Sequence, residues 1–350
     1  MLKEDIKRIL IINLGGIGDT LLSTPALRAL RKRYPDVQIS LLIIPRVFKL
    51  AKDLSFIDEV FIFYTDYRIG YFFKNLNTLL FLRKKHFDLA INMRTLVTKS
   101  GALKIRLLLD IINPKIKAGR DTQGRGSFFD IKIPETVKAD KYEMDYDIEI
   151  VEALGARVLD KAIDFEIKES NFKKINQILE TEGIAESDVL IGIYPGGKKS
   201  HRWQIENFSK VIDEIELKIP SKFIITGSND ESSLAKKLVQ INNTNVINLV
   251  GKLSLKELGA VIKVCELYIA NDSGPMHIAA ILGTPLIAIF GPGEIDRFDP
   301  RHISNRAVVF YRKVECAPCF RTNCKSLRCL KSIYPEEVVE AALKLLEIKN

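Results

Sequence analysis

The segment 271–283, NDSGPMHIAAILG, carries residue types that suit the binding of an anion. It follows the apolar run 267–270, so the pattern predicts a strand that turns through Asp-Ser-Gly-Pro and opens a helix. The first backbone N–H groups of a helix lack partners within it and attract negative charge. Pro275 fits the first helical position, and Asp272 or Ser273 fits the cap before it.

A second glycine turn, in the loop 194–203 (YPGGKKSHRW), also follows a strand-like run. It combines Gly196 and Gly197 with four side chains that can be cationic: Lys198, Lys199, His201 and Arg202. Convergent backbone N–H groups and positive charge are what a diphosphate requires. The alternative is an ordinary solvated basic loop. We expect Trp203 to pack against the helix that follows it.

A third glycine turn, GGIG at 15–18, leads into Asp19. A dinucleotide-binding motif would need a third glycine at position 21, which is leucine, and Asp19 puts a negative charge where the pyrophosphate would bind. Gly16 and Gly18, which would let a ligand approach closely, suit a general base at Asp19 better. The alternative is that Asp19 only caps a helix that starts at Thr20.

Two further polar residues have both a binding and a structural explanation. Asp230 follows the strand-like run 222–226 and could accept hydrogen bonds from ribose hydroxyls, or cap the helix expected over 231–241. His277 lies one turn into the helix after Asp272, on the side of the expected anion site; a lone helical histidine is usually a packed one.

Four cysteines stand close together near the C-terminal end, at Cys316, Cys319, Cys324 and Cys329. Their spacing fits a small structural zinc loop in a cytosolic chain. Disulfides would require an oxidising or hyperthermophilic setting, and free thiols packed in a loop are the third possibility. The sequence leaves all three open, and Cys265 is expected in the core.

Strands and helices alternate along most of the chain, which predicts an α/β protein of two doubly wound parallel sheets. We place the first domain at 1–165 and the second at 166–334, with a linker at 160–170. The stretch 120–134 lacks periodicity and is expected to be a long loop.

Composition and charge narrow the class of protein further. The chain has 350 residues, 47% of them hydrophobic, and a net charge of +9. No apolar run approaches the roughly 18 residues of a membrane-spanning helix, and the start has no secretion signal, so we expect a cytoplasmic protein. No basic block is long enough for a nucleic-acid tail, whereas a diffuse positive field suits phosphate ligands or an anionic membrane face.

Several of these segments together resemble glycosyltransferase family 9, the ADP-heptose:lipopolysaccharide heptosyltransferases. The motifs that carry the resemblance are INLGGIGD at 12–19 with TPAL at 24–27, YPGG at 194–197, NDSGPMH at 271–277 with GTP at 283–285, and FGP at 290–292. The resemblance implies a GT-B fold, with two Rossmann-like domains facing a cleft and a final helix, 335–350, that packs toward the N-terminal domain.

We therefore expect an inverting transferase. No acidic cluster resembling a Mg²⁺ site accompanies the nucleotide loop, so we expect it to be metal-independent and to need no cofactor. Asp19 would be the base, and Asp272, Ser273, Gly274 and His277 would hold ADP-heptose, with Leu253 near the adenine. The cationic loop departs from the family pattern, because its lysines lie at 198 and 199. The acceptor would be a lipopolysaccharide core or another glycolipid at the inner face of the membrane, contacted by the segments 94–99 and 120–127. Another nucleotide sugar, a non-catalytic nucleotide-sugar binder and a Rossmann oxidoreductase remain alternatives.

Overall fold

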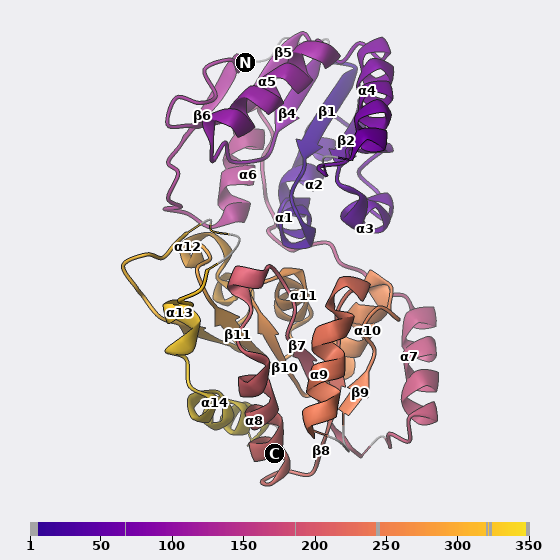
Figure 1. The fold of residues 1–350 in the computed structure, drawn as a ribbon. Helices are drawn as coiled ribbons and strands as arrows, with labels where there is room; N and C mark the ends of the chain where they lie inside the picture. Colours follow the sequence, from indigo (N-terminus) through magenta and orange to yellow (C-terminus); the bar gives the residue numbers. More distant parts are fainter. Residues whose placement is uncertain are drawn as a thin grey trace. The chain divides into compact units, whose positions relative to one another are not determined.

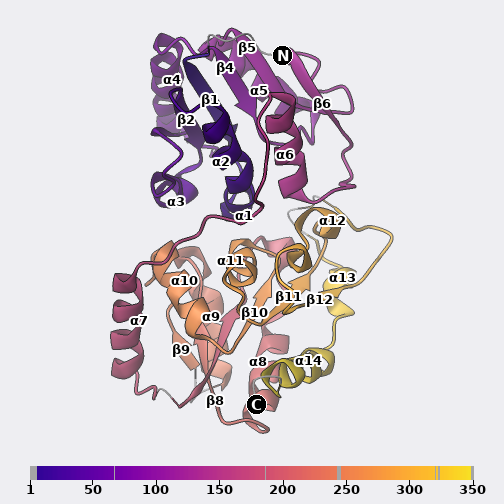
Figure 2. The same cartoon turned by 180° about the vertical axis from the view of Figure 1, so that it is seen from behind.

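The chain folds into two units, Met1–Asp164 and Phe165–Asn350. The computed structural model describes residues 6–66, 68–185, 187–242, 246–319, 321 and 324–347. Each unit is a parallel β-sheet with helices on both of its faces (Figures 1 and 2).

The sheet of the first unit has six parallel strands in the order β3-β2-β1-β4-β5-β6. The strands are β1 (Arg8–Asn13), β2 (Gln38–Ile43), β3 (Glu59–Ile62), β4 (Leu89–Asn92), β5 (Ile116–Thr122) and β6 (Ile131–Glu135). Residues 9–13 of β1 are all buried, as expected for a strand covered on both faces of a parallel sheet.

Helices cover the two faces of this sheet. They are α1 (Ile17–Leu22), α2 (Thr24–Arg33), α3 (Phe48–Lys52), α4 (Ile69–Lys84), α5 (Lys99–Ile112) and α6 (Glu143–Ala153). On one face α4 packs against α5 over Leu10 and Ile12 of β1. Elsewhere in the unit α2 packs against α6.

The second unit repeats this topology, with the strand order β12-β11-β10-β7-β8-β9. Its strands are β7 (Val189–Tyr194), β8 (Ser221–Ile225), β9 (Val246–Asn248), β10 (Leu267–Asn271), β11 (Leu286–Phe290) and β12 (Ala307–Tyr311). Its helices are α7 (Glu169–Thr181), α8 (Ile205–Glu216), α9 (Ser232–Asn242), α10 (Leu255–Val264), α11 (Gly274–Leu282), α12 (Ile295–Phe298), α13 (Arg328–Lys331) and α14 (Pro335–Glu347). Counted from the first strand of each unit, both sheets have the order 3-2-1-4-5-6, which is the Rossmann order.

The terminal helix differs from the expectation that it packs toward the first domain. Helix α14 belongs to the second unit, where it packs against α8. Its residues Val338, Val339, Ala342 and Leu346 are buried in the same core as Phe208 and Val211 of α8. An amphipathic helix buries its apolar stripe against the nearest apolar face, and here α8 offers one.

The expectation of a long loop over the whole of 120–134 was wrong. Strand β5 continues to Thr122 and β6 begins at Ile131, so the irregular part is limited to residues 123–130, which cross back along the sheet because the two strands are parallel. The sequence conceals β5 because Arg120 and Thr122 are polar residues that are fully buried. Buried polar side chains break the apolar pattern by which a central strand is recognised.

Among the described residues, no helix is both long and apolar enough to cross a membrane.

Candidate active site

The order of strands reverses between β1 and β4 in the first sheet and between β7 and β10 in the second. In open α/β sheets, ligands bind outside the carboxyl ends of the strands at this switch point. Asp19 follows β1, and the loops at 195–201 and 272–277 follow β7 and β10. Asp19 and the predicted residues at 196–201 and 272–277 therefore lie at the switch points, whereas Asp230 and Leu253 follow β8 and β9.

Asp19 is held by the glycine turn that precedes it. Helix α1 begins at Ile17 rather than at Thr20, and the backbone N–H of Gly16 donates a 2.6 Å hydrogen bond to Asp19 Oδ2. A Cβ on Gly15 would lie 2.5 Å from the Cβ of Asp19, so only glycine fits there. Asp19 does stabilise the helix start, but its side chain remains 16% exposed and can meet a ligand.

Arg94 pairs with Asp19. The sequence analysis placed Arg94 in segment 94–99, which was expected to contact the acceptor, but did not foresee its pairing with the base. Its guanidinium Nη1 donates to Asp19 Oδ1, and it also lies 2.9 Å from Glu143 Oε1. Burial disfavours the charged guanidinium, but Asp19 and Glu143 outweigh this effect and raise the pKa of Arg94. One oxygen of Asp19 is thus fixed by Arg94 and the other by Gly16.

A second arginine, Arg120, lies in the interior of the first unit and shares Glu143 with Arg94. Its side chain is completely buried and pairs with Glu143 at 3.1 Å, with Glu135 at 3.3 Å and with Asp147. Segment 120–127 was expected to contact an acceptor, and for Arg120 that expectation was wrong, because its guanidinium is enclosed by these carboxylates. We call Asp19, Arg94, Arg120, Glu135, Glu143 and Asp147 the buried charge network.

Asp147 is completely buried within this network, which favours its protonated form. The hydroxyl oxygen of Ser23 lies 2.7 Å from the carbonyl oxygen of Asp19 and 2.6 Å from Asp147 Oδ2, and it accepts from Asn13. Ser23 donates to Asp147 Oδ2, and this hydrogen bond favours the ionised carboxylate, so it opposes the rise in the pKa of Asp147. Burial raises the pKa of Asp147 to about 7, Arg120 opposes the shift, and Glu143 adds to it.

We expect Asp147→Asn to flatten the pH dependence of stability. Native Asp147 keeps its proton up to about pH 7, whereas the unfolded chain loses it near pH 4. Between these values the native state binds one more proton, so the free energy of unfolding of the wild type falls by up to about 1.4 kcal/mol per pH unit as pH rises. Asparagine has no proton to lose, and it can donate to Ser23 and accept from Arg120.

Urea unfolding between pH 5 and pH 8 measures the two slopes. Asp145→Asn is the matched control, because Asp145 is on the same helix but is an exposed partner of Lys161, and it should keep the wild-type slope. Parallel curves for wild type and Asp147→Asn would show that Asp147 is ionised in the native protein.

In the second unit, Asn271 joins the two strands of the switch point. Its Nδ2 donates to the carbonyl oxygens of Pro195 and Gly196, at 2.9 and 3.0 Å, and its Oδ1 accepts from the backbone N–H of Trp203. The buried Asn271 therefore fixes the glycine turn after β7 beside the start of α11. The sequence analysis placed Asn271 in its motif without assigning it a role.

Asp272 contacts His201 and does not cap α11. Asp272 Oδ2 lies 3.1 Å from His201 Nδ1, and Ser273 is the N-cap residue of α11, with no side-chain capping bond. A Cβ on Gly293 would lie 2.2 Å from Asp272 Oδ2, so glycine is needed there for the carboxylate to fit. The structure thus brings His201 into contact with Asp272, the residue before Ser273. Lys198 and Lys199 are exposed on the same loop as His201.

Glu231 is the acid that organises the glycine turn, and the sequence analysis selected its neighbour Asp230. Glu231 is buried and accepts hydrogen bonds from the N–H of Gly197 at 2.7 Å and from the hydroxyl of Tyr194 at 2.9 Å. The N–H of Gly197 is therefore directed at this carboxylate, which removes it from the donors expected for a diphosphate. The signal was present as the capping box S-x-x-E from Ser228 to Glu231.

We expect Glu231→Gln to destabilise the second unit by about 1–3 kcal/mol. The carboxylate now accepts a hydrogen bond from the N–H of Ser228, and the NH2 group of glutamine would face that N–H instead. The exposed Asp230 is the matched control, and Asp230→Asn should change stability by less than about 0.5 kcal/mol. Urea unfolding of both variants measures the difference. Equal stability of the two would show that Glu231 is not required to hold the turn.

The remaining predicted residues take several environments. Trp203 packs as expected, edge-to-face on Phe208, and its Nε1 donates to the carbonyl oxygen of Ile333. His277 is buried in α11 with its ring 5.9 Å from that of Phe298. Leu253 is partly buried and packs against the apolar cluster to which α7 and α10 contribute. Gly18 is buried in the first turn of α1, and Gly274 is the first residue of α11.

The cysteine-rich segment has free thiols in the structure. None of the five cysteines forms a disulfide. Cys316 is exposed and Cys329 is buried. Within the described ranges, no group of three or more histidine, cysteine or acidic side chains is arranged to hold a metal ion. Burial raises the pKa of Cys329 above the ordinary thiol value, which makes this thiol less reactive.

Two Rossmann-like units with polar turns at both switch points define the class of this chain as a two-domain α/β protein. The family model of glycosyltransferase family 9 (heptosyltransferase) matches residues 80–329, more than half of the chain. The chain belongs to this family, and it is a glycosyltransferase.

Similar proteins support this assignment over the whole length. The lipooligosaccharide heptosyltransferase 2 of Campylobacter jejuni is 28% identical over 345 residues, which are 95% of this chain and 96% of the relative. The crystal structure of a family 9 glycosyltransferase from Veillonella parvula has a TM-score of 0.75 at 25% identity, and covers 98% of this chain and 97% of its own. The structure of Escherichia coli ADP-heptose lps heptosyltransferase II has a TM-score of 0.72 at 20% identity, and covers 98% and 99%. The fold is GT-B.

Proposed function

We propose that this protein transfers heptose from ADP-heptose to a lipopolysaccharide-core acceptor, with inversion at the anomeric carbon. The observation that carries the proposal is that one unit has a fixed, partly exposed carboxylate, Asp19, at its switch point, and the other unit has polar loops at its own switch point. Support comes from the full-length similarity to a lipooligosaccharide heptosyltransferase and from the fold shared with an ADP-heptose heptosyltransferase.

In the proposed reaction Asp19 is the general base. It takes the proton of the acceptor hydroxyl as that oxygen attacks the anomeric carbon, while the bond to the diphosphate breaks and ADP leaves with the electron pair. Gly16 and Gly18 leave space for the acceptor beside the carboxylate. Arg94 and the N–H of Gly16 fix the two oxygens, so the base need not reorganise before it accepts the proton.

The second unit would hold the sugar nucleotide. We assign the departing diphosphate to the start of α11, where Ser273 and Gly274 lie, and to the cations Lys198, Lys199 and His201. Asp272 orients His201. Gly196 lets the turn close on Glu231, because a Cβ there would lie 1.9 Å from Glu231 Oε1. Asp230 would accept from the ribose, His277 would support the start of α11, and Leu253 would lie near the adenine.

A panel of nucleotide sugars tests the donor assignment. At a concentration 100 times its Kd, a ligand raises the free energy of unfolding by about 2.7 kcal/mol. We expect ADP-heptose and ADP to raise the melting temperature more than GDP- or UDP-sugars do, and His201→Ala to reduce the shift. A larger shift with another nucleotide sugar would favour the alternative of a GT-B transferase with a different donor.

We place the protein on the cytoplasmic side of the inner membrane, because a lipid-linked acceptor would be presented there. A non-catalytic nucleotide-sugar binder is the second alternative. It predicts the same thermal shift with no release of ADP when acceptor is added.

A further inference from the structure

Helix α4 has apolar side chains on its outer face as well as on the face that packs on the sheet. Leu79 and Leu82 are buried in the core below it. At the N-terminal end of the helix, Ile69, Phe72 and Phe73 are 82%, 63% and 59% exposed. Side chains separated by three or four positions share a face of a helix, so these three form one outward stripe. The outward side of a surface helix is normally polar, so exposed side chains of this size require an explanation.

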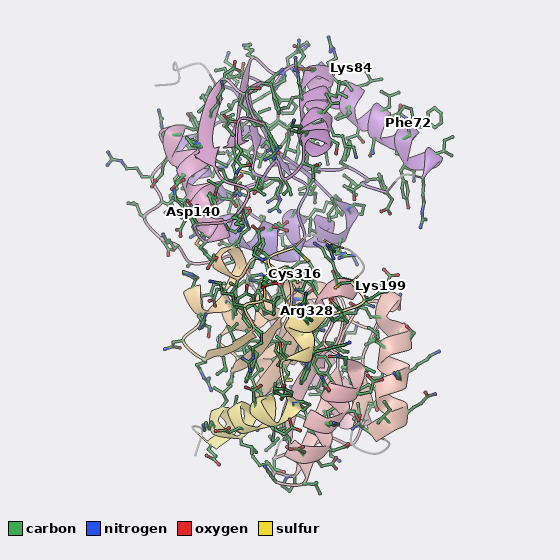
Figure 3. All side chains as sticks on the ribbon, turned by 60° about the vertical axis from the view of Figure 1, so that its left-hand side comes forward. Phe72, Lys84, Asp140, Lys199, Cys316 and Arg328 are labelled. Atoms are coloured by element: carbon green, nitrogen blue, oxygen red, sulfur yellow. The ribbon has the colours of Figure 1, made fainter. Side chains whose placement is uncertain are left out.

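The stripe continues into a larger exposed apolar surface. Leu80 and Phe81 of α4 are 45% and 53% exposed. On the adjacent α5, Leu103 and Leu107 are 55% and 53% exposed. We call these side chains the α4–α5 surface: Ile69, Phe72, Phe73, Leu80, Phe81, Leu103 and Leu107. Figure 3 shows Phe72 projecting outward from one end of α4 and Lys84 at the other end. Contiguous exposed apolar patches mark sites of interaction.

The charges around this surface have one predominant sign. Helix α4 contains Lys74, Arg83 and Lys84, Arg68 precedes it, and it has no acidic residue. Helix α5 contains Lys99, Lys104 and Arg106 against a single acid, Asp110, which pairs with Lys117 at 2.6 Å. Aromatic side chains flanked by cations are typical of helices that lie in the interface of an anionic bilayer.

We propose that the α4–α5 surface docks the protein on a bilayer of anionic phospholipid. Phe72 and Phe73 enter the headgroup region, and the cations at both ends of α4 contact lipid phosphates. The inference deepens the proposed function, because a lipid-linked acceptor is embedded in such a surface. The absence of acidic residues from α4 favours lipid over a second copy of this chain, since the stripe offers no negative charge to pair with the cations.

Co-sedimentation with vesicles tests the proposal. Wild-type protein should bind vesicles of phosphatidylglycerol and phosphatidylcholine, bind less as salt rises, and bind pure phosphatidylcholine weakly. Phe72→Ser/Phe73→Ser should weaken binding roughly tenfold or more. Leu159→Ser/Leu217→Ser is the matched control, because both leucines are 86% exposed and lie outside the surface, and it should bind as wild type does.

A charge pair provides the second test. Arg83→Gln/Lys84→Gln should lower affinity for anionic vesicles by about tenfold or more. Lys210→Gln/Lys236→Gln removes two exposed lysines of the second unit and should change the affinity for anionic vesicles much less. Wild-type affinity for both the serine pair and the glutamine pair would overturn the proposal. So would a wild-type dimer that Phe72→Ser/Phe73→Ser converts to a monomer in sedimentation equilibrium, since that result assigns the surface to a second copy.

The proposal can fail independently of the proposed function. With a water-soluble, lipid-free acceptor saccharide, the serine pair should transfer heptose at the wild-type rate, because the base and donor loops are untouched. If wild type shows no transfer but the vesicle results hold, the proposed function fails and the docking surface stands. If transfer occurs but vesicles do not bind, the docking surface fails alone.

Discussion

Asp19→Asn should reduce the rate of heptose transfer by about 10²–10⁴-fold while leaving the affinity for ADP-heptose unchanged. The amide is nearly the same size as the carboxylate but cannot accept the proton of the acceptor hydroxyl. The donor residues proposed here lie in the second unit, so their contacts are not altered by the substitution. Single-turnover transfer and calorimetric binding of ADP-heptose measure the two quantities separately.

The fold of this variant should survive, because the buried charge network contains four carboxylates and two guanidiniums. The amide oxygen can still accept from the N–H of Gly16, and its NH2 group then faces Arg94. Arg94 tolerates this because it is 26% exposed and keeps Glu143 as its partner. Loss of donor binding together with transfer would indicate a structural role for Asp19. Rates close to wild type would remove it as the base.

Arg120→Met should lower the free energy of unfolding by about 3–5 kcal/mol, the largest loss of stability that we expect from a single substitution in this chain. The guanidinium is fully buried and is shared by Glu143, Glu135 and Asp147. Methionine fills a similar volume but leaves these carboxylates without their cation in a medium where unpaired charge is costly. Urea unfolding at constant pH measures the effect.

Arg106→Met is the control for this substitution, because Arg106 is 60% exposed and lies 3.7 Å from Asp110. An exposed pair of this kind contributes less than about 0.5 kcal/mol, so the control should unfold nearly as wild type does. Adding Asp147→Asn to Arg120→Met should recover part of the loss. Equal stability of Arg120→Met and the control would mean that the network is hydrated rather than buried.

The sequence predicted the parts of the fold that depend on apolar runs and glycine turns. Strands such as β1 and β10 are continuous apolar segments, and the turns that follow them contain the glycines that let the chain reverse. Because parallel strands end at a common edge, the positions of Asp19 and of the 271–277 motif followed from the order of elements.

The buried charge network could not be predicted in the same way. Arg120 and Glu143 are separated by 23 positions, and Arg94 and Asp19 by 75, so no periodic pattern links the partners. A charged residue in a central strand also looks like a loop residue until its partners are known, which is why 120–134 was expected to be a loop. Glu231 was overlooked because its exposed neighbour Asp230 has the same chemistry.

The central claim is tested most directly by incubating the purified protein with ADP-heptose and a heptose-free lipopolysaccharide-core acceptor, and determining the product by mass spectrometry and NMR. The account predicts one heptose added per ADP released, with the anomeric configuration inverted, and no product from Asp19→Asn. Transfer from a different nucleotide sugar in preference to ADP-heptose, or a product with retained configuration, would contradict it.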